Sequence, residues 1–120
     1  RIMLALKVVL ARLGTVETLI FDEIDAGIGG AVADAVGERL ARLGRERQVL
    51  VVTHAPQVAA RANHHFRVAK GGGADGVGVA VEALGAAARE EEIARMLAGA
   101  EVTAAARAAA QSLLATRAEG

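Results

Sequence analysis

Cysteine is absent from this 120-residue sequence, and aromatic residues make up only 2% of it. Without cysteine, the chain forms neither a disulfide bond nor a thiolate metal site. Hydrophobic residues make up 53% of the chain, so aliphatic side chains and alanine must fill the core in place of aromatic rings. The longest apolar runs, near residues 19–21 and 49–52, are far too short to span a bilayer.

The chain has no excess of either charge, because 14 basic residues balance 14 acidic ones. A stand-alone nucleic-acid-binding domain normally carries a basic excess, so the composition does not favour that class. The length fits one modest domain, and no linker divides it. The first residue is Arg1 and a helical pattern begins at once, so we expect a fragment of a longer protein. The absence of cysteine and of a signal peptide agrees with a cytoplasmic protein.

Helical and strand patterns alternate along the first half of the chain. Apolar residues at helical spacing predict helices over residues 2–13 and about 32–43. Two short apolar runs, 18–21 and 48–53, predict buried strands. Pro56 suits the first turn of a short helix toward residue 62. This order predicts an α/β fold with a mainly parallel sheet and flanking crossover helices.

The second half predicts a hairpin followed by helices. Strand patterns over 65–70 and 76–84 flank the glycine-rich stretch 71–75, so we expect an antiparallel hairpin at the margin of the sheet. Further helices are expected from 90 to 97 and from a Thr103 cap to about residue 116. Glutamates 90–92 fit a solvated helix start, which the helix dipole favours.

Two adjacent acids, Asp22 and Glu23, follow the first predicted strand. A buried strand rarely ends in two acids unless negative charge is used there. In P-loop ATPases such an acid holds Mg²⁺, and a second group orients or deprotonates the attacking water. Because neighbouring strand residues point to opposite sides, Asp22 can face a metal while Glu23 reaches toward the water. Acids that only solvate the strand end are the alternative.

His54 comes directly after the second predicted strand. If the two strands are parallel, it lies at the same edge as Asp22, where open α/β sheets bind their ligands. An imidazole there can donate a hydrogen bond to a γ-phosphate oxygen. A single histidine is more often a structural residue, so its position after the strand is what favours a binding role. We expect Thr53 to fix the strand end.

The loop Asp25–Gly30 is rich in glycine, which allows positive φ angles and close approach to another surface. It is not a phosphate-binding loop, because the pattern GxxxxGK[ST] occurs nowhere in the sequence. The spacing of Gly27, Gly29 and Gly30 also misses the dinucleotide-binding fingerprint. An ordinary strand-to-helix connection is the alternative.

The segments LIFDEIDAGIGG (19–30) and VVTHAPQVA (51–59) resemble the RecN family of bacterial DNA-repair ATPases, relatives of the SMC and ABC ATPases. The resemblance extends through 66–70 and 89–99 and covers essentially the whole chain. It implies the C-terminal lobe of a P-loop ATPase head, with residues 1–120 forming one half of a split head and no second domain. Ala55 departs from the larger apolar residue expected at its position, which leaves the implied chemistry intact.

The resemblance also implies roles for individual residues, with ATP and Mg²⁺ as cofactors. Asp22 would be the Walker B metal acid and Glu23 the catalytic carboxylate, and His54 would contact the γ-phosphate. The nucleotide contacts of the D-loop would be Asp25, Ala26, Gly27 and Gly29, which face a partner head. The implied partners are the N-terminal half of the same head, a second copy through head engagement, and DNA in the full-length, nucleoid-associated protein, but no membrane. We expect the isolated chain to be inactive.

Two other functions remain open from the sequence. The ATP-binding subunit of a transporter shares the strand that ends in acids, but the loop Asp25–Gly30 and the lack of an obvious surface for a membrane partner argue against it. A structural module whose acids do not catalyse is the other alternative.

Overall fold

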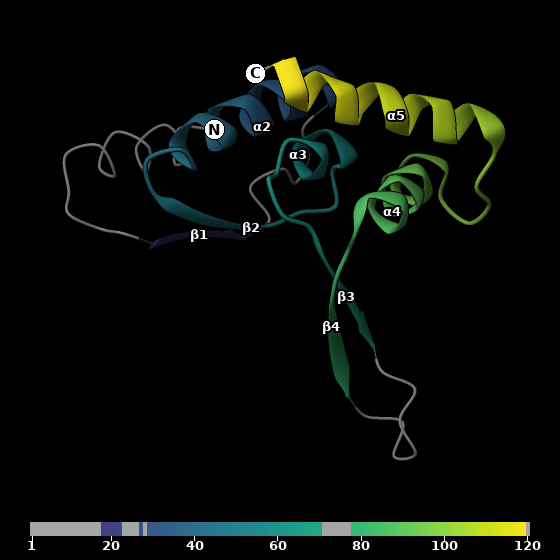
Figure 1. Cartoon of the computed structure of the whole chain (residues 1–120), viewed down its shortest axis with the longest axis horizontal. Coiled ribbons are helices and arrows are strands. Elements are labelled where there is room, and N and C mark those ends of the chain that lie inside the picture. Colours follow the sequence, from purple (N-terminus) through teal and green to yellow (C-terminus); the bar gives the residue numbers. More distant parts are fainter. Residues whose placement is uncertain (1–17, 23–26, 28, 71–77, 120) are drawn as a thin grey trace.

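The computed structural model describes residues 18–22, 27, 29–70 and 78–119 (Figure 1). The predicted helix over 2–13 lies outside them, as do Glu23, Asp25 and Ala26 of the predicted site. The elements in chain order are β1 (Thr18–Asp22), α2 (Gly30–Leu43), β2 (Gln48–Val52), α3 (Pro56–Ala60), β3 (Phe66–Lys70), β4 (Val79–Ala83), α4 (Ala86–Ala98) and α5 (Ala104–Glu119).

Strands β1 and β2 pair in parallel, with Thr18 opposite Gln48 and Asp22 opposite Val52. Helix α2 connects them and covers one face, so the predicted strand–helix–strand unit is confirmed. Phe21 is only 1% exposed and packs in a core cluster with the apolar stripe of α2, which consists of Ala33, Val36, Leu40 and Leu43. This cluster fixes the side of the sheet on which α2 lies.

A second core lies among the helices. Ile93 and Ala94 of α4 are fully buried against Ala106 and Ala110 of α5. Alanine dominates this cluster, which allows the helix backbones to approach closely in a protein with so few large side chains. Helix α3 contributes to both cores, because its Val58 packs in the first cluster and Ala59 and Ala60 pack in the second.

The predicted antiparallel hairpin is confirmed, with Phe66 opposite Ala83 and Lys70 opposite Val79. Its predicted place at the margin of the parallel sheet is not confirmed, because β3 and β4 form a two-stranded sheet of their own. The hairpin projects away from the helices in Figure 1. The described strands therefore make one parallel and one antiparallel pair, and a mainly parallel sheet is not confirmed.

The start of α4 and the end of α5 differ from the prediction. Helix α4 begins at Ala86, four residues before the predicted start at Glu90, because the alanines after Gly85 continue the helix without a polar cap. The Thr103 cap is confirmed, since its Oγ1 accepts a hydrogen bond from the N–H of Ala106 at 3.1 Å, and α5 runs on to Glu119. No helix in the described part of the chain is both long and apolar enough to span a membrane.

Candidate active site

Asp22 and His54 lie at the same edge of the parallel pair. Asp22 is the last residue of β1 and stands opposite Val52, the last residue of β2, and His54 follows two residues later. The two strands pair without an offset, so their carboxyl ends lie at the same edge of the sheet, as the sequence predicts. Both residues are exposed. The structure thus places a carboxylate and an imidazole at the edge where α/β sheets bind ligands.

The chain turns sharply after β2 and presents His54 at this turn. Thr53 Oγ1 accepts a hydrogen bond from the N–H of Ala55 at 3.0 Å, which confirms that Thr53 fixes the strand end. Ala55 has extended backbone angles and Pro56 begins α3, where its missing N–H leaves no donor unsatisfied. His54 is therefore held between a strand and a helix that are both anchored in the core.

One described position of the glycine loop has a backbone conformation that favours glycine. Gly27 has a φ angle of +75°, which side chains other than glycine rarely adopt. At Gly30, the first residue of α2, an added Cβ would lie 3.3 Å from Nε2 of Gln57 in α3. Gly29 is the N-cap of α2, and its carbonyl accepts the N–H of Ala33 at 2.9 Å. Among the described positions of this loop, the backbone at Gly27 therefore favours glycine.

The side of β1 and β2 that faces away from α2 exposes three large apolar side chains. Ile20, Leu50 and Val52 remain 66%, 47% and 54% exposed, and we call these three residues the open face. Because side chains alternate along a strand, Asp22 lies on the same side as Ile20. Parallel sheets are normally covered on both faces. The Asp22 carboxylate therefore lies at the edge of an exposed sheet face that a further layer of protein could cover.

Among the described residues, no group of three or more histidine, aspartate or glutamate side chains is arranged to enclose a metal ion. Mg²⁺ does not need such a cage, because it keeps several waters and binds one or two carboxylates together with substrate phosphates. An exposed Asp22 at a strand end fits this mode of binding.

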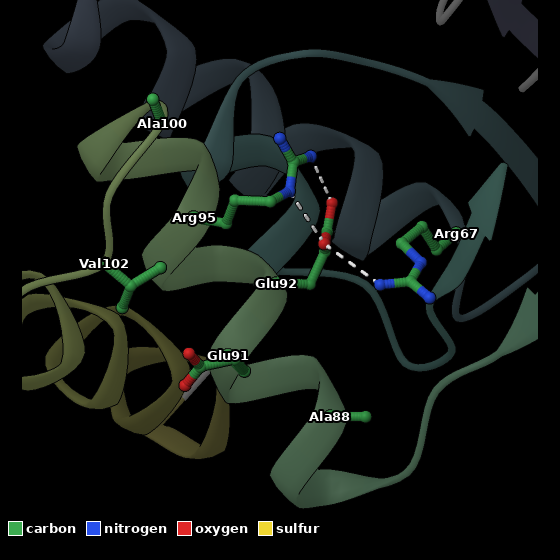
Figure 2. Close-up of a pocket in the computed structure, with 7 residues that line it drawn as sticks. All are labelled: Arg67, Ala88, Glu91, Glu92, Arg95, Ala100 and Val102. Carbon is green, nitrogen blue, oxygen red and sulfur yellow. Dashed lines mark hydrogen bonds and ion pairs between the residues drawn. The ribbon is translucent and has the colours of Figure 1, made fainter. Parts of the chain in front are cut away.

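A second charged cluster was missed by the sequence reasoning. Glu92, which fits a solvated helix start in the sequence, is buried in the second turn of α4, with its side chain 7% exposed. It accepts hydrogen bonds from Arg95, including one from Nε at 3.0 Å, and pairs with Arg67 of β3 at 3.9 Å (Figure 2). Hydrogen bonds from Arg95 hold the pKa of the Glu92 carboxyl below its ordinary value.

These residues line a cavity of about 350 Å³ between the hairpin, α4 and the turn before α5. Its charged residues already have partners, two of them outside the cavity: Arg67 also binds Glu82 at 2.7 Å, and Glu91 binds Arg107 at 3.1 Å. The cluster therefore joins the hairpin to α4 and does not belong to the edge that carries Asp22. Only the run of three glutamates signalled it in the sequence.

The fold places the chain in a known structural class. It superimposes with a TM-score of 0.68 on a solved structure, over 82% of this chain and 59% of the other. That structure comes from work on the structural biochemistry of ATP-driven dimerization and DNA-stimulated activation of SMC ATPases. At 19% sequence identity, this likeness concerns the fold alone. The described lobe thus shares its architecture with SMC ATPases.

Sequence comparison gives a narrower result. The chain is 51% identical over 115 residues to the DNA repair protein RecN of Xylella fastidiosa, 48% over 116 residues to that of Streptomyces coelicolor, and 50% over 114 residues to that of Mycobacterium leprae. These matches cover at least 95% of the chain but only about a fifth of each relative. No family model matches. In sequence, the chain is thus similar to a segment of these RecN proteins.

Proposed function

We propose that the chain is the C-terminal half of an ATP-hydrolysing head in a DNA double-strand-break repair protein. The observation that carries the proposal is the shared edge of β1 and β2, where Asp22 and His54 stand together beside the open face. The RecN relatives and the SMC-like fold support the same class. In this proposal, ATP drives engagement of two heads and thereby DNA binding by the full-length protein.

Each of three residues would have a separate role in ATP hydrolysis. Asp22 would hold Mg²⁺, which when bound neutralises charge on the phosphate oxygens. Glu23, the next residue in sequence, would orient and deprotonate the attacking water. His54 would donate a hydrogen bond to a γ-phosphate oxygen and so stabilise the charge that develops there. Rate enhancement then depends on placing these groups rather than on covalent chemistry.

The missing phosphate-binding loop requires a partner. We propose that the open face docks against the N-terminal half of the same head, which would bring its Walker A loop to the edge beside Asp22. The face is apolar and lies on the side of Asp22, which supports this arrangement. The chain also spans only about a fifth of its relatives, so a full-length protein would contain the residues needed to cover it.

The hairpin offers a second surface for the same partner. Phe66, Val68, Val79 and Val81 share one face of β3 and β4 and are all more than half exposed. A two-stranded hairpin is marginally stable in water when nothing covers it. We propose that the N-terminal half covers this face as well as the open face.

The glycine loop would face a second copy of the head. Asp25, Ala26, Gly27 and Gly29 would approach the partner's nucleotide, and the positive φ of Gly27 supports a backbone built for close approach. DNA binding belongs to the full-length protein, since this chain has no net charge. We place that protein in the cytoplasm, associated with the nucleoid.

The proposal is tested by the ATP turnover of the full-length protein. We expect Asp22→Asn to reduce Mg²⁺-dependent turnover by at least about a hundredfold, since one neutralised acid removes the metal contact. Glu46→Gln, which neutralises an exposed acid in the turn between α2 and β2, is the matched control and should turn over normally. Equal rates for the two variants would refute the role of Asp22 and favour a non-catalytic module.

A further inference from the structure

Helix α3 connects the candidate site to the core formed by α4 and α5. It contains only five residues, Pro56–Ala60, and begins directly after the turn that carries His54. Figure 1 shows it between the parallel sheet and α4. Since Val58 packs in the core of the sheet and Ala60 in the core of the helices, α3 is fixed by both. A shift of α3 would therefore act on the turn that carries His54.

Arg89 of α4 holds the opposite end of this helix. It is buried, with 7% of its surface exposed, and its Nη2 donates hydrogen bonds to the carbonyl oxygens of Ala59 at 3.0 Å, Ala60 at 3.2 Å and Ala62 at 2.5 Å. The last carbonyls of a helix have no partner within it and need one when they are buried. A positive charge at this end also complements the helix dipole. A single guanidinium thus caps α3.

Helix α2 fixes α3 from the other side. A Cβ added to Gly37 of α2 would lie 3.0 Å from Cγ of Arg61, 3.1 Å from the carbonyl oxygen of Gln57 and 3.2 Å from Cα of Val58. The two backbones therefore touch at Gly37. Arg61 also pairs with Asp34 of α2 at 3.0 Å. Between Gly37 and Arg89, α3 has little room to move.

We propose that Arg89 is a positioning residue for His54 and acts by fixing α3. The inference rests on the proposed contact between His54 and the γ-phosphate. Catalytic groups must be held closely, because a displacement of about 1 Å far from the reacting atoms can reduce the rate by about a hundredfold. The hydrogen bonds of Arg89 to Ala59, Ala60 and Ala62 all lie at the C-terminal end of α3, so they act on His54 through α3.

The test measures ATP turnover and ADP affinity in the full-length protein. We expect Arg89→Met to lower kcat by about ten- to a hundredfold and to leave the Kd for ADP within about twofold, because ADP lacks the phosphate that His54 would contact. Arg89→Lys should retain more activity than Arg89→Met, since all three hydrogen bonds come from one nitrogen. Arg107→Met, which removes an exposed arginine paired with Glu91, is the control and should turn over normally.

Combining Arg89→Met with His54→Ala distinguishes an effect on the position of His54 from a general loss of protein stability. If Arg89 acts through His54, Arg89→Met should cause no further loss in the His54→Ala background. Losses that multiply, or an equal fall in ADP affinity, would overturn the inference. Wild-type turnover in His54→Ala alone would instead refute the proposed role of His54, a result distinct from failure of Arg89 to act through it.

Gly37→Ala provides a second route if Arg89→Met does not fold. The added Cβ would displace α3 from the opposite side without removing the Arg89 guanidinium that binds its carbonyls. We expect kcat to fall without a change in ADP affinity and without further loss in the His54→Ala background. Unchanged turnover, or a loss that multiplies with that of His54→Ala, would overturn the inference.

Discussion

Replacing Ile20 by aspartate places a carboxylate in the middle of the open face of β1 and β2. Ile20 is 66% exposed, and burying an isoleucine completely stabilises by about 1.5–3 kcal/mol, so covering the rest contributes about 1–2 kcal/mol. Truncation in Ile20→Ala should therefore weaken docking of the N-terminal half by about five- to thirtyfold. Ile20→Asp adds the desolvation of a charge, which costs several kcal/mol, and should abolish docking.

The assay is a fluorescence titration between the two halves of the head, produced as separate chains. Ala108→Asp adds the same charge at an exposed position of α5 and serves as the matched control. The expected order of affinity is wild type, equal to Ala108→Asp, then Ile20→Ala, then Ile20→Asp. Wild-type affinity in Ile20→Asp would refute the assignment of the open face as the docking surface.

Three further outcomes follow from the same structure. Phe21→Ala removes the largest side chain of the sheet core, which is 1% exposed, and should lower the free energy of unfolding by about 3–5 kcal/mol in a denaturant titration of the full-length protein; a loss below about 1 kcal/mol would contradict the core. Glu92→Gln should destabilise the head at neutral pH and flatten its stability profile in acid. Because Arg95 lowers the folded pKa of Glu92, its contribution is present above the ordinary value of 4.5 and is lost as the pH falls through the lowered pKa; identical acid profiles would contradict this. The isolated chain should show no appreciable ATP binding by calorimetry, since it lacks the phosphate-binding loop, and tight binding would mean that the composite site is wrong.

Local patterns were sufficient to predict the parts of the fold that carry Asp22 and His54. The apolar runs ending at Asp22 and before His54 predicted strands, and the helix between them made a parallel pair with a common edge the simplest arrangement. Periodicity also located the buried stripe of α2, because helical spacing of apolar residues depends only on neighbours in sequence. The common edge that carries Asp22 and His54 thus followed from short-range information.

The remaining features depend on contacts between distant residues. A strand pattern does not specify which strand will lie beside it, so the separation of the hairpin from the parallel pair was not predictable. Glu92 also pairs with Arg67, which comes from the hairpin 25 residues earlier in the chain. The capping of α3 by Arg89 likewise joins residues 27 to 30 positions apart. No pattern within either segment marks these pairs.

The central claim is that this chain supplies the acids of a composite ATP site, and Glu23→Gln in the full-length protein tests it most directly. Sedimentation with ATP and Mg²⁺, measured beside turnover, should find a stable ATP-dependent dimer whose hydrolysis is reduced by at least about a hundredfold, because the amide can still hydrogen-bond water but cannot take its proton. Undiminished turnover, or no dimer with ATP, would contradict the account.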